Sequence, residues 1–191
     1  GDWYIFYHRH TNGTWFSRQG CAEKLPIRED GLFGQAELTS CGLNGGPLAG
    51  EGYYPSCIAC HLFTDRPVIY VGDSDKPEYV NGSFPKIVKE GWDGDQNEGY
   101  ITNMYDQCTA GFRYFDLSHV SEITLTIRGY AYGSMEIRTS FEGSAVKTIP
   151  LHYSNIWRDI KTEIKLPEGA DSLYFTYRGP GSASFKGFTL K

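Results

Sequence analysis

From residue 86 to the end of the chain, short stretches of strand-forming residues alternate with turn residues at intervals of roughly 8–12 residues. Apolar and polar residues alternate strictly over 123–127 (Ile-Thr-Leu-Thr-Ile), which predicts a strand with one buried and one solvent-facing side. Helical periodicity is hard to find anywhere in the sequence. We therefore expect an all-β, antiparallel β-sandwich. Its strands are expected at 56–63, 86–89, 99–104, 110–116, 122–129, 134–141, 146–151, 156–165, 172–178 and 184–190.

The first 52 residues have a different character. Residues 3–10 alternate aromatic and polar side chains, and further extended stretches are expected at 16–27 and 34–39. Residues 42–52 are rich in glycine and are interpreted as a linker. The expected organisation is a β-segment at 1–41, a linker at 42–52 and a sandwich at 53–191.

Composition narrows the classes of partner. The formal net charge of −5 and the pI near 5.5 argue against nucleic acid, which requires a basic face. No apolar run approaches the roughly 20 residues needed to cross a bilayer, so no membrane partner is expected. The chain opens on Gly1-Asp2-Trp3-Tyr4 without a signal peptide and is interpreted as the interior of a longer, secreted precursor.

Five cysteines cannot all pair within one chain. Cys57 and Cys60 have the spacing of a redox or zinc pair, but no second ligand pair follows, which favours buried thiols. Asn12-Gly13-Thr14 and Asn81-Gly82-Ser83 match glycan acceptor sites, and each is equally an Asn-Gly turn.

The second half carries an ordered set of short motifs over residues 86–191. They are Glu98-Gly99-Tyr100-Ile101, the run Gly133 to Arg138, Trp157, Gly169 with the run Leu173 to Gly179, and Phe185-Lys186-Gly187-Phe188. This set resembles the family-six carbohydrate-binding modules and their galactose-binding-like jelly-roll relatives. The resemblance implies a jelly-roll sandwich that binds sugar and does not catalyse a reaction.

The first forty residues resemble a different family. The run Trp3 to Arg9, the run Ser17 to Glu23 and Asp30-Gly31 are similar to the closing blade of a glycoside hydrolase family 43 propeller. This resemblance implies a parent enzyme of the xylosidase or arabinofuranosidase type, with three acidic catalytic residues on earlier blades. It also makes the catalytic propeller a partner and His8 a candidate for approaching its central ion. No catalytic residue is expected in this chain, which contains no Gly-x-Ser-x-Gly motif.

A sugar site needs exposed aromatic faces beside polar groups. By resemblance, Tyr100 and Trp157 flank a sugar ring in a loop-end cleft, although Trp157 is also compatible with a core or edge position. The Asn that the family usually places in the last loop is missing, so Ser182 or Ser184 would replace it. Tyr130 and Tyr132 form a second aromatic pair, either a platform for sugar or, as we favour, a cap on the sandwich.

An acidic stretch offers oxygen ligands of the kind that calcium prefers. It contains Asp93, Asp95 and Glu98. The family resemblance implies a structural calcium with Glu90 as an early ligand, whereas Lys186 lies near the position of a late acidic ligand. A solvated acidic loop without metal is the alternative and the favoured interpretation.

Three functions follow from these observations. The first is a non-catalytic module that binds plant cell-wall polysaccharide of the xylan or arabinoxylan type. The second is a part of a family 43 hydrolase whose catalytic blades lie elsewhere. In the third, the sandwich packs on the propeller and shapes its substrate pocket without binding sugar by itself.

Overall fold

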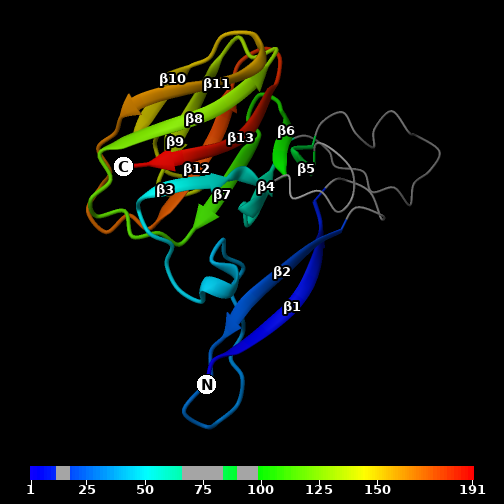
Figure 1. Ribbon diagram of the computed structural model, residues 1–191, viewed down its shortest axis with the longest axis vertical. Coiled ribbons are helices and arrows are strands. Elements are labelled where there is room, and N and C mark those ends of the chain that lie inside the picture. Colours follow the sequence, from blue (N-terminus) through cyan, green and yellow to red (C-terminus); the bar gives the residue numbers. More distant parts are fainter. Residues whose placement is uncertain (12–17, 66–83, 90–98) are drawn as a thin grey trace, which may run out of the picture.

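The computed structural model describes residues 1–11, 18–65, 84–89 and 99–191. This part of the chain consists of β-strands, turns and two short 3-10 helices, η1 (Gly42–Asn44) and η2 (Ser56–Ile58). Figure 1 shows two layers of strands, with a long two-stranded hairpin extending away from one end of them. The expected all-β class and the antiparallel sandwich are confirmed. No helix in the described ranges is long and apolar enough to cross a membrane.

The sandwich consists of two antiparallel sheets. The first has the order β10 (Lys147–Pro150), β9 (Ser134–Arg138), β12 (Ser172–Arg178), β7 (Thr109–Arg113) and β4 (His61–Phe63). The second has the order β11 (Ser154–Glu163), β8 (Glu122–Gly129), β13 (Ala183–Leu190), β6 (Tyr100–Met104) and β5 (Lys86–Val88). Its sixth strand, β3 (Gly52–Pro55), pairs with the second half of β13.

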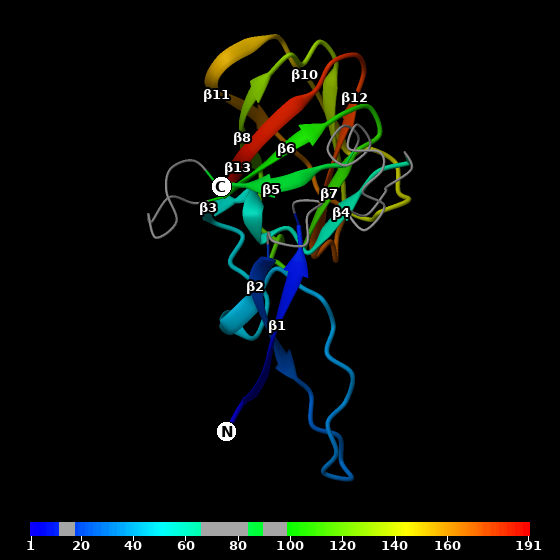
Figure 2. The ribbon, with the colours of Figure 1, turned by 90° about the vertical axis from the view of Figure 1, so that its right-hand side faces the viewer.

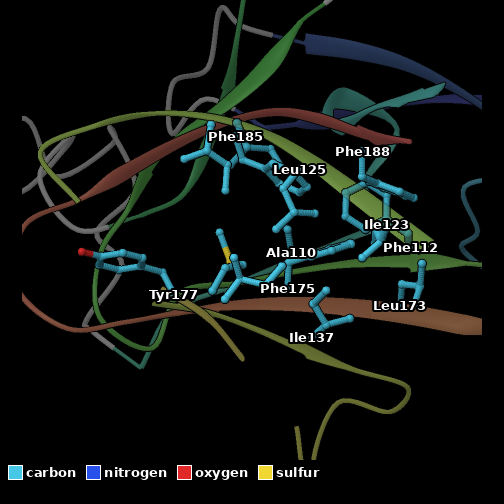
Figure 3. Close-up of a cluster of buried hydrophobic side chains, with 14 of the residues drawn as sticks. Ala110, Phe112, Ile123, Leu125, Ile137, Leu173, Phe175, Tyr177, Phe185 and Phe188 are labelled. Carbon is cyan, nitrogen blue, oxygen red and sulfur yellow. The ribbon is translucent and has the colours of Figure 1, made fainter. Parts of the chain in front are cut away.

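The core lies between the two sheets and is rich in phenylalanine. Along β8, Ile123, Leu125 and Ile127 are buried while the residues between them face outward, as the alternation predicts. Rings from both sheets meet edge to face, for example Phe112 and Phe188 with centroids 5.0 Å apart. Figure 3 shows these side chains pointing toward one another from the two layers. The core fixes which side chains of each strand face outward.

The N-terminal hairpin packs on one end of the sandwich. Strands β1 (Trp3–His10) and β2 (Arg18–Leu25) pair in register from Trp3↔Leu25 to His10↔Arg18. The Arg9 guanidinium donates to the Ala59 carbonyl at 3.1 Å, and the Gln19 amide donates to the Cys57 carbonyl at 2.6 Å. Both views place the hairpin below the sandwich (Figures 1 and 2).

The extended stretch expected at 34–39 does not form a strand. These residues pair with no strand in the described ranges. Instead, the Thr39 N–H donates to the buried carboxylate of Glu23 at 2.8 Å, and the Thr39 hydroxyl donates to its other oxygen at 2.6 Å. Because a side chain satisfies this N–H, the segment lies against the hairpin without joining its sheet.

The glycine-rich stretch 42–52 lies against the sandwich. The Leu48 N–H donates to the Tyr114 carbonyl, and the Leu48 carbonyl accepts from the Asp116 N–H, both at 2.8 Å. A Cβ at Gly50 would lie 2.1 Å from the Asp116 carbonyl oxygen, so this approach requires glycine. The domain boundaries at 41 and 52 stay a prediction.

Candidate functional site

Tyr100 and Trp157 are neighbours on the outer face of the six-stranded sheet. Their ring centroids lie 5.2 Å apart with an interplanar angle of 81°. The Arg128 guanidinium lies 4.2 Å from the Trp157 ring centroid and 5.3 Å from that of Tyr100, and it donates to the Tyr100 hydroxyl at 3.1 Å. The two rings therefore contact each other and share a cation. This arrangement leaves no space for a sugar ring between them.

Strand alternation explains this grouping. Arg128 continues the outward series of β8, and Tyr100 precedes the buried Ile101 of β6. The register of β11 against β8 shifts between Ser154 and Arg158, and Trp157 lies in this irregular stretch. Ser184 faces outward on β13, where its hydroxyl lies 2.9 Å from that of Thr102. Trp157 is therefore an outward residue and not part of the core.

A second aromatic group lies at the end of the sandwich where β8 finishes and β13 begins. Tyr130 and Tyr132 are 66% and 61% exposed, so most of each side chain faces solvent at this end of the sandwich. Tyr153, which is 45% exposed, joins them: its ring centroid lies 5.0 Å from that of Tyr130 and 6.3 Å from that of Tyr132. The Tyr132 and Tyr153 rings are nearly parallel, at 13°. We call these three residues the tyrosine platform.

The loop that carries Tyr130 and Tyr132 is held by hydrogen bonds to the last loop. The Ser182 N–H donates to the Tyr130 carbonyl at 3.2 Å, so Ser182 contributes through its backbone. The Tyr132 N–H donates to the buried Tyr177 hydroxyl at 3.1 Å. Ala131, between the two tyrosines, is buried and forms a β-bridge with Gly181. The exposed rings therefore project from an ordered backbone, which lowers the entropy lost when a ligand binds.

Tyr153 joins the platform through a third segment, just after β10. The Leu151 N–H donates to the Gly133 carbonyl at 2.8 Å, which ties the end of β10 to the platform loop two residues before Tyr153. Sequence analysis did not select Tyr153. The available signal was an aromatic residue in an expected turn between two strands.

Polar groups border the platform. A hollow of about 600 Å³ is lined by Tyr105, Asp106 and residues 179–181. The Asp106 carboxylate accepts from the Gly179 N–H at 2.8 Å. The neighbouring Tyr130 raises the pKa of Tyr153. Aromatic faces beside hydroxyls and a carboxylate are the groups that bind sugars, which combine C–H patches with hydroxyls.

The expected metal and glycan positions lie outside the described residues. These are Glu90, Asp93, Asp95 and Glu98 for calcium, and Asn12 and Asn81 for glycans. Among the described residues, no three His, Cys, Asp or Glu side chains are grouped to hold a metal. The exposed His8 ring lies 5.9 Å from that of His10. None of the five cysteines, all of which are described, forms a disulfide, and Cys60 is buried with its sulfur 3.4 Å from the Gly111 carbonyl oxygen.

A second surface of interest belongs to the N-terminal segment. Large apolar side chains are exposed on the hairpin and in the stretch that follows it: Trp3, Ile5, Phe6, Ile27, Leu32, Phe33 and Leu38. Phe6 is 71% exposed. Trp3 and Phe33 contact each other, with ring centroids 5.6 Å apart, and Ile5 shares the Trp3 face of β1, whereas Phe6 lies on the opposite face.

Comparisons with known proteins agree with this architecture. No family model matches the chain. The chain is 51% identical over 190 residues to a xylosidase/arabinosidase of Thermoclostridium stercorarium, covering 100% of this chain and 40% of that protein. A family 43 arabinoxylan arabinofuranohydrolase of Bacillus subtilis, solved with cellotetraose, superposes over 100% of this chain and 38% of its own, with a TM-score of 0.57 and 15% identity.

The sandwich also matches isolated modules. A family 6 carbohydrate-binding module of Clostridium stercorarium, solved with cellobiose, covers 77% of this chain and 98% of its own, with a TM-score of 0.57 and 11% identity. The chain spans about two fifths of the length of the xylosidase/arabinosidase it matches. Over its whole length the chain is thus similar to the C-terminal part of a xylosidase/arabinosidase, and its sandwich has the fold of a family 6 carbohydrate-binding module.

Proposed function

We propose that this chain is a non-catalytic, secreted carbohydrate-binding module that attaches a glycoside hydrolase to plant cell-wall polysaccharide of the xylan or arabinoxylan type. The observation that carries the proposal is the tyrosine platform, where three exposed rings project from an ordered backbone. Exposed aromatic rings of this kind can bury their faces by stacking on the apolar C–H faces of a saccharide.

The size of the platform favours a chain ligand over a single sugar. Two ring contacts, at 5.0 and 6.3 Å, join the three tyrosines into one surface. The hollow at Asp106 is lined by residues 179–181 of the last loop, which pairs with the loop of Tyr130 and Tyr132, and the Asp106 carboxylate can accept hydrogen bonds from sugar hydroxyls. Related folds were solved with cellobiose, with xylose and with cellotetraose, and the xylosidase/arabinosidase relative supports a xylan-type ligand.

Tyr100 and Trp157 fit a sugar-stacking role less well. Arg128 lies over the Trp157 ring at 4.2 Å and Lys186 lies 5.7 Å from the same centroid, so cations already contact the indole. A neutral sugar would have to displace a cation–π contact worth about 0.5–1 kcal/mol at an exposed position.

Isothermal titration with xylohexaose and with arabinoxylo-oligosaccharides tests the proposal. We expect Tyr153→Ala to weaken binding about 30-fold, because truncation of a central aromatic contact costs about 2 kcal/mol. Trp157→Ala is the matched control and should leave the affinity for these neutral ligands within about twofold. Absence of heat with every β-1,4-linked ligand, or a loss confined to Trp157→Ala, would contradict the proposal.

The exposed apolar side chains of the N-terminal segment favour a second function, in which this segment docks on the catalytic part of the parent hydrolase. Phe6 and Trp3 are 71% and 57% exposed, and the matched proteins extend well beyond this chain. We expect the chain to co-elute with the separately produced catalytic part of the relative on a sizing column. Phe6→Lys should abolish the complex, whereas the exposed control Tyr132→Lys should keep it; separate elution of the unmodified partners would refute docking.

For the acidic stretch, we propose a structural calcium held by Glu90, Asp93 and Asp95. The support is the oxygen-rich composition together with the family resemblance of Glu90. Calcium should raise the melting temperature after treatment with a chelator, and Glu90→Gln should remove that increase. An unchanged melting temperature on calcium addition would favour a metal-free loop.

A further inference from the structure

A second hollow lies on the outer face of the six-stranded sheet, away from the tyrosine platform. Its volume is about 460 Å³, within the range of small-ligand sites. It is lined by Tyr53, Thr124, Thr126, Trp157, Asp159, Lys186 and Thr189. These residues come from β3, β8, β11 and β13, so the hollow is built on paired strands.

A β-bulge shapes this hollow. The register of β13 against β8 shifts between Phe185 and Gly187, and Lys186 is the exposed residue at the shift. At Gly187, a Cβ would lie 2.7 Å from the Tyr53 hydroxyl oxygen, so the absence of a side chain makes room for the phenol. The Tyr53 hydroxyl in turn donates to the Lys186 carbonyl at 3.3 Å. The bulge and Gly187 together allow the Lys186 side chain to line the same hollow as Thr124, Thr126 and Thr189.

The hollow contains the ammonium group of Lys186 and the carboxylate of Asp159. The Lys186 ammonium lies 5.7 Å from the Trp157 ring centroid, and the Arg128 guanidinium lies over the same ring at 4.2 Å. The Asp159 carboxylate, on β11, accepts from the Thr126 hydroxyl of the neighbouring β8 at 2.6 Å. This hydrogen bond fixes the position of the carboxylate. Two cations thus gather at the indole of a chain whose net charge is −5.

We propose that this hollow binds a saccharide unit that carries a carboxylate, that is, a uronic acid residue. Its carboxylate would lie at the Lys186 ammonium, which lines the hollow and can donate a charge-assisted hydrogen bond. Its ring hydroxyls would face the hydroxyls of Thr124 and Thr189 and the acceptor oxygens of Asp159. A neutral sugar would gain no ion pair with Lys186, so the site selects acidic over neutral units. This site goes beyond the proposed function, because the tyrosine platform binds neutral chains without it.

Two titrations separate this site from the platform. By NMR, sodium glucuronate should shift the Trp157 indole N–H signal, whereas glucose at the same concentration should not. By calorimetry, a xylo-oligosaccharide with one glucuronic acid branch should bind about tenfold more tightly than the unbranched oligosaccharide, since a hydrogen bond to a charged group contributes about 1.5 kcal/mol or more. This preference should weaken as salt is raised.

The variants assign the effect to the hollow. Lys186→Gln should abolish the preference for the acidic ligand and Lys186→Arg should retain it, while neither changes the affinity for the neutral chain. Tyr153→Ala should weaken both ligands equally and keep their ratio. Equal affinity for both ligands in the unmodified chain, or an unchanged preference in Lys186→Gln, would overturn the uronic acid site. A wrong assignment of the neutral-sugar site to the tyrosine platform would give a different result: Tyr153→Ala would leave the affinity for the unbranched oligosaccharide unchanged.

Discussion

Gly181 provides a test of the platform that removes no aromatic ring. Its φ is +83°, and a Cβ at this position would lie 1.7 Å from the Tyr130 carbonyl oxygen and 2.9 Å from the carbonyl carbon. Because both contacts are to backbone, Gly181→Ala must displace the platform loop. The left-handed conformation costs about 1 kcal/mol for alanine and the steric overlap about 1–3 kcal/mol more. The expected total is about 2–4 kcal/mol.

Gly169→Ala is the matched control for Gly181→Ala. Gly169 has a similar φ of +75°, but no atom lies within 4 Å of its Cβ position, so only the conformational cost of about 1 kcal/mol applies. Scanning calorimetry should show a fall in melting temperature of about 2–4 °C for Gly169→Ala and about two to four times that for Gly181→Ala. Only Gly181→Ala should weaken xylohexaose binding. If both variants melt alike and bind normally, the pairing of the two loops does not hold the platform.

Three further predictions concern stability. Phe175→Ala, at a fully buried ring, should lower the free energy of unfolding by about 3–5 kcal/mol in urea; a loss below 1 kcal/mol would contradict the packed core. Tyr177→Phe removes a hydroxyl that donates to the Pro180 carbonyl at 2.5 Å and accepts from Tyr132, so we expect a loss of about 1–3 kcal/mol and weaker sugar binding; an unchanged urea midpoint would refute this. The hydrogen bond to Glu37 raises the pKa of Tyr114 to about 12, which favours the neutral phenol in the folded state. Its contribution is present below pH 10 and is lost as the pH rises toward 12, so melting temperatures measured from pH 9 to 12 should fall more steeply for the unmodified chain than for Tyr114→Phe, and parallel curves would contradict the assignment.

The strands were predictable from sequence where alternation is local. The limits expected for 122–129 and 172–178 are those of β8 and β12. Apolar and polar residues alternate in the first segment, and strand-forming residues fill the second. The stretch 34–39 has the composition of a strand, but the carboxylate of Glu23, more than ten residues earlier, binds the N–H of Thr39. No local pattern contains that interaction.

The sequence identified some residues of the candidate sites but not the contacts between distant segments that bring them together. Tyr130 and Tyr132 were selected as an i, i+2 pair, but their exposure depends on the bridge from Ala131 to Gly181, fifty residues away in sequence. Tyr153 reaches them because Leu151 binds Gly133. Trp157 was selected by family resemblance, whereas the cations that contact it, Arg128 and Lys186, come from other strands. Contacts across strands are set by the register of the sheets, which the sequence of one strand does not specify.

The most direct test of sugar binding by the tyrosine platform is an NMR titration of the chain with xylohexaose, in which ring and backbone signals are followed residue by residue. We predict saturable shifts at Tyr130, Tyr132 and Tyr153 and in the loop at 179–182, with the indole N–H of Trp157 unchanged. Shifts that centre on Trp157 and Tyr100 and leave the three tyrosines unaffected would contradict the account.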